Sequence, residues 1–491
     1  MAINRKNINR IYYILDTENK TAYVCRLDAR EQYEGYIEIP SLITYYRKQY
    51  RVCSIYRHAF SGCKELTAIT IPDSVTTIGD RAFSGCTGLT AITIPNSVTT
   101  IGEGAFSGCT GLTAITLPDN ITTIGDRAFD GCTGLTAITI PDSVTTIGDR
   151  AFSGCTGLTA ITIPDSVTTI GDRAFSGCTG LTTITIPNSV TTIGEGAFYD
   201  TLWYHNQPSG PIYIGRVLYD YKGDMFPKTD FVVKNGTVYI CSETFYDCKN
   251  LTSITIPDSV TTIGYRAFDG CTGLTAVTIP DCGTWKDTFR GCIGLTAITI
   301  SDSVTTIGDR AFSGCTGLTT ITIPNSITAI GEWAFSGCTG LTAITIPNSV
   351  TTIGGFAFLG CTRLTAITFP NSVTTIGNYT FRNCTGLTAM TIPNSITTIG
   401  EWAFSGCIGI TKIHIPDGVT CIEDNAFSGS GLTEVYLPKT IEQVISHPGF
   451  GEVCNIFSGC EKLKKIYVPR GTKDTFDKMG LRPYYDMIVE L

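Results

Sequence analysis

A unit of 23 residues is repeated along most of this chain. One copy opens at Leu66 and reads LTAITIPDSVTTIGDRAFSGCTG, and the next opens at Leu89 as LTAITIPNSVTTIGEGAFSGCTG. After an interruption the pattern resumes at Leu251 and continues through the copy that opens at Ile410, with one shorter copy at 280–301. A repeat of this length predicts a solenoid, in which each copy forms one rung that contacts only its neighbours.

Each copy carries the pattern of a strand followed by turns. Residues 66–71 have the LxxLxL spacing of a strand with one apolar face, and Pro72 ends it because proline has no N–H to donate. Residues 75–78 form a second short extended stretch, and 82–86 are expected to form a short helical turn. One copy cannot bury its apolar side chains alone, so stacking must bury them. We therefore predict a curved repeat solenoid, mostly β with short helices, with one parallel β-strand per 23-residue rung.

Two regions depart from the repeat and divide the chain into five segments. Residues 1–62 alternate like hairpin strands and are expected to form an N-terminal β cap with a degenerate first repeat. Regular arrays are expected at 63–198 and 251–437. Residues 199–250 are interpreted as degenerate rungs with a protruding loop, and 438–491 as divergent last repeats and a C-terminal cap.

The cysteines follow the repeat instead of indicating a disulfide scaffold. Of 21 cysteines, fifteen fall in one column of the repeat. We interpret this column as a stacked ladder of buried thiols, because free cysteine behaves as a small buried hydrophobe. No pair has the short CxxC spacing typical of a metal site, so no metal and no cofactor are predicted. The column consists of Cys63, Cys86, Cys109, Cys132, Cys155, Cys178, Cys248, Cys271, Cys292, Cys315, Cys338, Cys361, Cys384, Cys407 and Cys460.

Charge and hydropathy exclude two classes of partner. The net charge of −8 disfavours binding to nucleic acid. No segment reaches the ~20 apolar residues of a membrane-spanning helix, so no membrane span is predicted. Residues 1–16 contain no apolar signal core. Two explanations stay open: the protein is not exported and is cytoplasmic, or the Met-Ala start replaces a signal that was removed.

No arrangement of residues predicts catalysis. The chain has four histidines, and their wide separation in sequence places them far apart in a one-dimensional stack. Neither a Ser–His–Asp nor a Cys–His pairing can be built from them, so we expect no enzymatic activity. The histidines are His58, His205, His414 and His447.

One exposed column varies while its surroundings stay constant. It starts as His58, Arg81 and Gly104, and it carries arginine in most of the first half of the chain. In the second half it carries four aromatic residues in consecutive copies, which we call the aromatic edge: Trp333, Phe356, Tyr379 and Trp402. Exposed aromatic rows are typical of binding surfaces, so the aromatic edge is the first candidate site, although packing under the adjacent edge would also explain it. The second candidate is the loop segment Trp203, Tyr204 and His205.

The repeat LTxITIPxSVTxIGxxAFxGCxx resembles the BspA-like leucine-rich-repeat family, over about residues 59 to 470. The segments 202–227 and 466–476 are also similar to bacterial members of that family. The resemblance implies a leucine-rich-repeat rod and a surface-exposed or secreted protein of bacteria or protists. It also implies adhesion to a protein or glycan partner, including a partner derived from a host.

Two hypotheses for function follow. The first is a non-enzymatic binding or adhesion module that presents its aromatic edge to a protein or glycan. The second is a structural, self-assembling rod with no small ligand. The protein is accordingly expected to be a monomer or a weak oligomer that associates through the edge.

Overall fold

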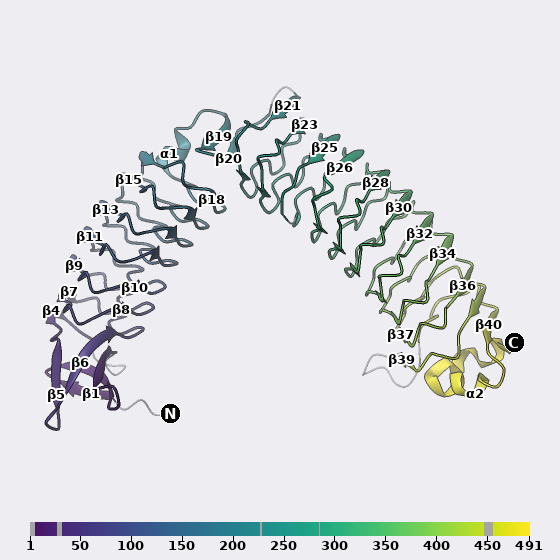
Figure 1. Cartoon of the computed structure of the whole chain (residues 1–491), viewed down its shortest axis with the longest axis horizontal. Helices are drawn as coiled ribbons and strands as arrows, with labels where there is room; N and C mark the ends of the chain where they lie inside the picture. Colours follow the sequence, from purple (N-terminus) through teal and green to yellow (C-terminus); the bar gives the residue numbers. More distant parts are fainter. Residues whose placement is uncertain (1–4, 27–31, 226–227, 284, 446–454) are drawn as a thin grey trace. The chain divides into compact units, whose positions relative to one another are not determined.

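The structure, a computed structural model, describes residues 5–26, 32–225, 228–283, 285–445 and 455–491. It forms a solenoid in two compact units, Met1–Lys222 and Gly223–Leu491 (Figure 1). The predicted solenoid is confirmed, with a parallel strand in each rung and a short second strand in most rungs. Among the four histidines, His447 lies outside the described residues.

The first unit begins with an antiparallel meander of β1 (Arg5–Ile8), β2 (Ile11–Asp16) and β3 (Thr21–Cys25). Strand β3 then pairs in parallel with β6 (Lys48–Ile55), while β5 (Leu42–Tyr45) forms a hairpin with β6. Because β4 pairs in parallel with β7, and β6 with β8, residues from Gly35 onward already form a rung that carries the hairpin as an insertion.

Two parallel ladders run through the first unit. In the first ladder Ala, Ile and Thr of most rungs stand opposite the same residue types of the next, for example Ala91 opposite Ala114. Its strands are β4 (Gly35–Glu38), β7 (Leu66–Thr70), β9 (Ala91–Thr93), β11 (Ala114–Thr116), β13 (Ala137–Thr139), β15 (Ala160–Thr162) and β17 (Thr183–Thr185). The second ladder contains β8 (Thr77–Ile78), β10 (Thr100–Ile101), β12 (Thr123–Ile124), β14 (Thr146–Ile147), β16 (Thr169–Ile170) and β18 (Thr192–Ile193). The unit ends with α1 (Leu202–His205) and the hairpin of β19 (Gly210–Ile214) with β20 (Val217–Lys222).

The second unit repeats this arrangement. Its first ladder contains β21 (Thr229–Val232), β23 (Leu251–Thr255), β25 (Ala276–Ile279), β26 (Ala297–Ile300), β28 (Thr320–Thr322), β30 (Ala343–Thr345), β32 (Ala366–Thr368), β34 (Ala389–Thr391), β36 (Lys412–His414), β38 (Glu434–Tyr436), β40 (Lys465–Val468) and β41 (Ile488–Glu490). Its second ladder contains β22 (Tyr239–Ile240), β24 (Thr262–Ile263), β27 (Thr306–Ile307), β29 (Ala329–Ile330), β31 (Thr352–Ile353), β33 (Thr375–Ile376), β35 (Thr398–Ile399), β37 (Cys421–Glu423) and β39 (Gln443–Ile445).

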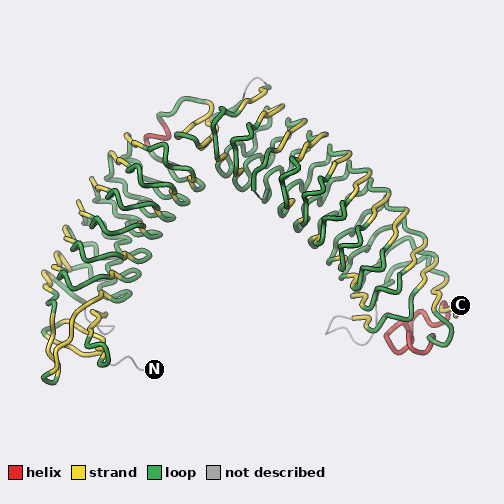
Figure 2. The backbone as a smooth tube through the Cα atoms, viewed as in Figure 1, coloured by secondary structure: helices red, strands yellow, loops and turns green. Residues whose placement is uncertain are grey.

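The third segment of each rung is a run of turns, where a short helical turn was expected. In the rung that opens at Leu66, alternate amides bond locally, as from Ser84 to the Arg81 carbonyl at 3.2 Å. The amides between them bond to the following rung, as from Phe83 to the Ala105 carbonyl at 2.7 Å. This inter-rung bonding forms a third ladder of hydrogen bonds, which a helix would not provide. Figure 2 shows how short the strand segments of a rung are and how much of it is turn and loop.

The core of each unit is a column of stacked phenylalanines. In the first unit it runs from Phe60 to Phe198, with ring centroids 5.1 to 5.6 Å apart at successive rungs. In the second unit it runs from Phe245 to Phe457, with centroids 5.2 to 5.9 Å apart. We call this column the core phenylalanine ladder.

The cysteine column lies beside the core phenylalanine ladder. Its thiols are free, and nearly all of them are buried. Thirteen of the fifteen donate to a phenylalanine carbonyl of the previous rung, as from Cys338 Sγ to the Phe312 oxygen at 3.1 Å. Burial raises the pKa of Cys338 from 9.0 to about 12. These cysteines are therefore inert packing groups at neutral pH.

The C-terminal end carries the remaining helices. They are α2 (Lys473–Phe476), a π-helical turn at Asp477–Leu481 and a 3-10 segment at Arg482–Met487. Phe476 and Leu481 are buried there. Across the described ranges, no helix is both long and apolar enough to cross a bilayer.

Candidate functional site

The variable column lies at a left-handed position of every rung in which it is described. The φ angle is 52° at Arg81, 58° at Trp333, 59° at Phe356 and 54° at Trp402. Glycine at 104 and asparagine at 425 adopt the same conformation, which suits both residue types. The side chain at this position points away from the core, and the phenylalanine two residues later fills the core instead. The fold therefore does not dictate which residue occupies the column.

The four residues of the aromatic edge are brought together. Trp333 and Phe356 stack with centroids 4.0 Å apart and ring planes 5° apart, and Phe356 and Tyr379 with centroids 4.5 Å apart. Tyr379 and Trp402 are farther apart, at 6.3 Å with 11° between planes. All four rings are half-buried. Because the rings are parallel at rung spacing, they cover each other's faces and present ring edges to the solvent.

Charged groups flank the aromatic edge. The Arg310 guanidinium lies 6.0 Å from the Trp333 ring centroid, and that of Arg382 lies 5.1 Å from the Trp402 centroid and 5.5 Å from the Tyr379 centroid. Trp402 donates from Nε1 to Glu401 Oε1 at 3.0 Å. Partial burial, followed by the nearby Glu401 carboxylate, raises the pKa of Tyr379. The edge is thus an apolar strip with both signs of charge beside it.

The arginines of the same column in the first unit form ion pairs along the turn face. Arg81 and Arg127 both contact Glu103, at 3.0 and 3.3 Å, and Arg173 contacts Glu195 at 3.5 Å. The aspartate that precedes each of these arginines has another role, because one of its oxygens accepts the amide of the next rung, as at Asp126 Oδ1 from the Asp149 amide. These ion pairs are substantially exposed, so each stabilises the fold little.

Asp287 is a member of this column that the sequence pattern concealed. It lies in the copy that is two residues short, and its φ angle is 53°. Its side chain is buried, and the neighbouring members of the column are Arg266 and Arg310. Burial raises the pKa of Asp287, while the charge of Arg310 acts in the opposite direction.

The second candidate, Trp203, Tyr204 and His205, forms the short helix α1. The Trp203 ring meets Phe198 edge-on with centroids 5.2 Å apart, and the Tyr204 hydroxyl donates to Asp220. His205 is exposed and lies 3.4 Å from Asp200. Lys222 donates from Nζ to the carbonyls of Tyr204, His205 and Gln207. All three candidate side chains thus make contacts within this part of the unit, and His205 is the exposed one.

A further aromatic stack was not recognised in the sequence. His414, Tyr436 and Tyr467 occupy the exposed strand column that is threonine in the preceding rungs, such as Thr391. The His414 and Tyr436 rings stack with centroids 4.4 Å apart, and the Tyr436 and Tyr467 rings at 4.5 Å. The signal was available, because the threonine of this column is replaced in the last copies, which read KIHIP, EVYLP and KIYVP.

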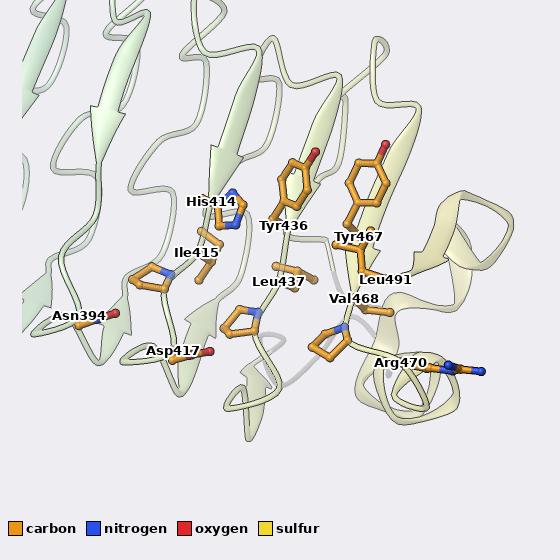
Figure 3. Close-up of a pocket in the computed structure, with 13 residues that line it drawn as sticks. Asn394, His414, Ile415, Asp417, Tyr436, Leu437, Tyr467, Val468, Arg470 and Leu491 are labelled. Carbon is orange, nitrogen blue, oxygen red and sulfur yellow. The ribbon is translucent and has the colours of Figure 1, made fainter.

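This second stack forms one wall of a groove of about 520 Å³, which we call the C-terminal groove (Figure 3). Prolines 416, 438 and 469 and the buried side chains of Ile415, Leu437 and Val468 line it as well. Asn394, Asp417 and Arg470 contribute polar side chains to the lining, and Leu491 borders it. Within the described part of the chain, no cluster of His, Cys, Asp and Glu is arranged to hold a metal ion.

Comparison with known proteins places these features in a family. Six overlapping copies of a family model described as "BspA type Leucine rich repeat region" match residues 43–159, 105–214, 224–342, 284–388, 328–451 and 374–479. A leucine-rich repeat protein from Bacteroides ovatus is 26% identical over 99% of each chain, with a TM-score of 0.45. A leucine rich cell surface protein from Faecalibacterium prausnitzii is 25% identical over 98% of each chain, with a TM-score of 0.31. A leucine-rich repeat protein from T. pallidum is 29% identical over 41% of this chain and 90% of that one, with a TM-score of 0.37. No curated protein matches the chain.

Proposed function

This chain belongs to the BspA type leucine-rich repeat family, and on that premise we propose that it is a non-enzymatic binding module that holds a partner protein along its aromatic edge. The family suggests a role in protein interaction or as a surface scaffold. We further propose that the module acts at the cell surface, where bacterial relatives of this family are found.

The observation that carries the proposal is the placement of four aromatic rings in consecutive rungs outside the core. The core phenylalanine ladder runs separately through Phe335, Phe358, Phe381 and Phe404, all fully buried. Other rungs fold with arginine, glycine or asparagine at the same left-handed position. The rung therefore does not require the rings, and aromatic residues concentrated on a surface are typical of binding hot spots.

The shape of the aromatic edge favours a protein over a small ligand. The ring faces are taken by their neighbours, so a ligand meets a strip of ring edges, without the enclosed pocket typical of small-molecule sites. Three rung spacings of ~4.8 Å make the strip about 14 Å long. Arg382 and Glu401 supply polar contacts at its rim. An apolar centre with a polar rim is the usual composition of a protein interface.

The test is the double variant Trp333→Asn and Trp402→Asn, which installs the residue that the chain itself uses at Asn425. Wild type and variant are applied to immobilised purified extracellular-matrix and plasma proteins, and association is followed by biolayer interferometry. We expect the variant to lose the binding of whichever protein the wild type retains, with only a small decrease in the melting temperature. The matched control is Arg127→Asn and Arg150→Asn, in the same column of the first unit. Equal binding by the double variant, or no binding by the wild type, would contradict the proposal.

The presence of both charge signs beside the strip supports one alternative, a rod that self-associates through this edge. Arg310 and Glu332, like Arg382 and Glu401, would allow a second copy to meet the strip with complementary charges. Sedimentation velocity at high protein concentration tests this alternative. A monomer at all concentrations excludes self-association, and an oligomer that the double variant abolishes supports it.

A further inference from the structure

The C-terminal groove has an apolar wall that the repeat does not require. His414, Tyr436 and Tyr467 replace the threonine that the preceding copies carry in this column of exposed strand positions. His414 is exposed, and the two tyrosines are half-buried. Figure 3 shows the three rings side by side on successive strands, with both tyrosine hydroxyls at the outer ends of the rings. The groove volume of about 520 Å³ lies in the range of small-ligand sites.

The backbone lining the groove is already bonded within the solenoid. The Ile415 amide donates to the Tyr436 carbonyl, and the Leu437 amide donates to the Tyr467 carbonyl, both at 2.9 Å. The Leu491 amide donates to the Val468 carbonyl at 2.9 Å. The three prolines that follow these strands have no N–H at all. A peptide that pairs its main chain with a strand would therefore find few partners here, so recognition must rely on side chains.

The polar side chains of the groove suit a hydroxyl-rich neutral ligand. Asn394, Asp417 and Arg470 are exposed and line it, and together they offer hydrogen-bond donors and acceptors. The lining contains one acidic side chain, Asp417, and one basic side chain, Arg470, so it has no strong excess of one charge. On the adjacent strand positions, Lys412 is paired with Glu434 at 2.9 Å.

We propose that the C-terminal groove binds a short neutral oligosaccharide. The apolar C–H faces of the sugar rings lie against the prolines and the exposed ring edges of the aromatic wall, while Asn394, Asp417 and Arg470 hydrogen-bond to the hydroxyls. This site is separate from the aromatic edge, uses different residues and does not depend on the function proposed for that edge. The combination of an apolar wall with a few convergent polar groups is the general pattern of small-ligand sites.

The test uses the full chain on printed arrays of neutral di- to tetrasaccharides built from glucose, galactose, mannose and xylose. The best-retained sugar is then titrated calorimetrically. The decisive variant is the triple change His414→Thr, Tyr436→Thr and Tyr467→Thr, which restores the residue of the preceding rungs. We expect this variant to lose detectable binding. A second variant, Arg470→Ala, changes an exposed side chain and is expected to weaken binding roughly tenfold to hundredfold by loss of a charged hydrogen bond.

The matched control is the double variant Trp333→Asn and Trp402→Asn, which should bind the sugar as the wild type does. Circular dichroism and the melting temperature establish that each variant is folded. If the triple variant does not fold, Arg470→Ala alone decides the outcome. Failure of the wild type to retain any neutral sugar overturns the proposal, as does unchanged affinity in Arg470→Ala. A preference for sulfated saccharides or for proline-rich peptides on a parallel array would also overturn it.

Discussion

Phe404 and Trp402 lie two residues apart in one turn, yet we expect their removal to have very different effects on stability. Phe404 is fully buried and stacks between Phe381 and Phe427, with centroids 5.5 and 5.4 Å away. Trp402 is half-buried and stacks on Tyr379 at 6.3 Å. The contrast between Phe404→Ala and Trp402→Asn therefore measures whether the two aromatic columns have the different roles assigned to them.

The magnitudes follow from burial and geometry. Phe404→Ala removes a fully buried ring and leaves a cavity, a change that destabilises proteins by about 3 to 5 kcal/mol. Trp402→Asn removes a half-exposed ring and one distant stacking contact, worth about 0.5 to 1.5 kcal/mol. The new asparagine also tolerates the left-handed backbone well. We expect losses of about 4 and about 1 kcal/mol in the free energy of unfolding, a difference of roughly a hundredfold in the unfolding equilibrium.

The assay is urea unfolding followed by fluorescence and circular dichroism, combined with hydrogen exchange of the peptides that cover this rung and its neighbours. The exchange data matter because solenoid rungs open locally, so a single global transition does not describe them. Faster exchange in Phe404→Ala should spread to the rungs of Phe381 and Phe427. Similar losses in the two variants, or a greater loss in Trp402→Asn, would refute the separation of core and edge.

Three further predictions concern the rest of the fold. Gly171→Ala should lower the free energy of unfolding by about 1 to 3 kcal/mol in urea titrations, because a Cβ there would lie 2.6 Å from the Asp149 nitrogen. An unchanged midpoint would show that neighbouring rungs can move apart to make room for the Cβ. The free energy of unfolding should stay constant below about pH 8 and fall as the pH rises from 9 toward 12. The reason is that thiols of the unfolded chain lose their protons near pH 9.0, whereas Cys338 in the folded protein keeps its proton to about pH 12. Each such buried thiol lowers the free energy of unfolding by about 1.4 kcal/mol per pH unit in this range. Cys338→Ala should therefore make the decrease of the free energy of unfolding with pH shallower, and equal slopes in wild type and variant would refute this linkage. Lys222→Met should speed hydrogen exchange in residues 202–207, because Lys222 Nζ donates to three carbonyls of that segment. Unaltered exchange there would mean that the other contacts of the segment are enough to hold it in place.

Much of the fold could be predicted from the sequence because stacking multiplies a simple pattern. Ile69 and Ile92 occupy the same position of the repeat and both face the core. Every further copy of the repeat is another check on the prediction that this position is buried. The third segment was harder to predict. The residues AFSGC have an apolar spacing that fits a helical turn, but their amides bond to the next rung, as from Phe83 to Ala105. That choice depends on a neighbour 22 residues away, which local propensity does not include.

The candidate sites were also predicted partly from the sequence, while other features of them became apparent only in the structure. The sequence by itself determined the column of Trp333, Phe356, Tyr379 and Trp402, because residues 23 apart must become neighbours in a stack. Only the tertiary structure decided that these rings cover each other's faces on a left-handed turn outside the core. It also decided that Trp203 packs on Phe198, and that Tyr436 and Tyr467 border a groove with Arg470. The physical reason is that periodicity fixes which residues meet along the rod, whereas ring orientation and groove shape depend on contacts between different segments of the rung.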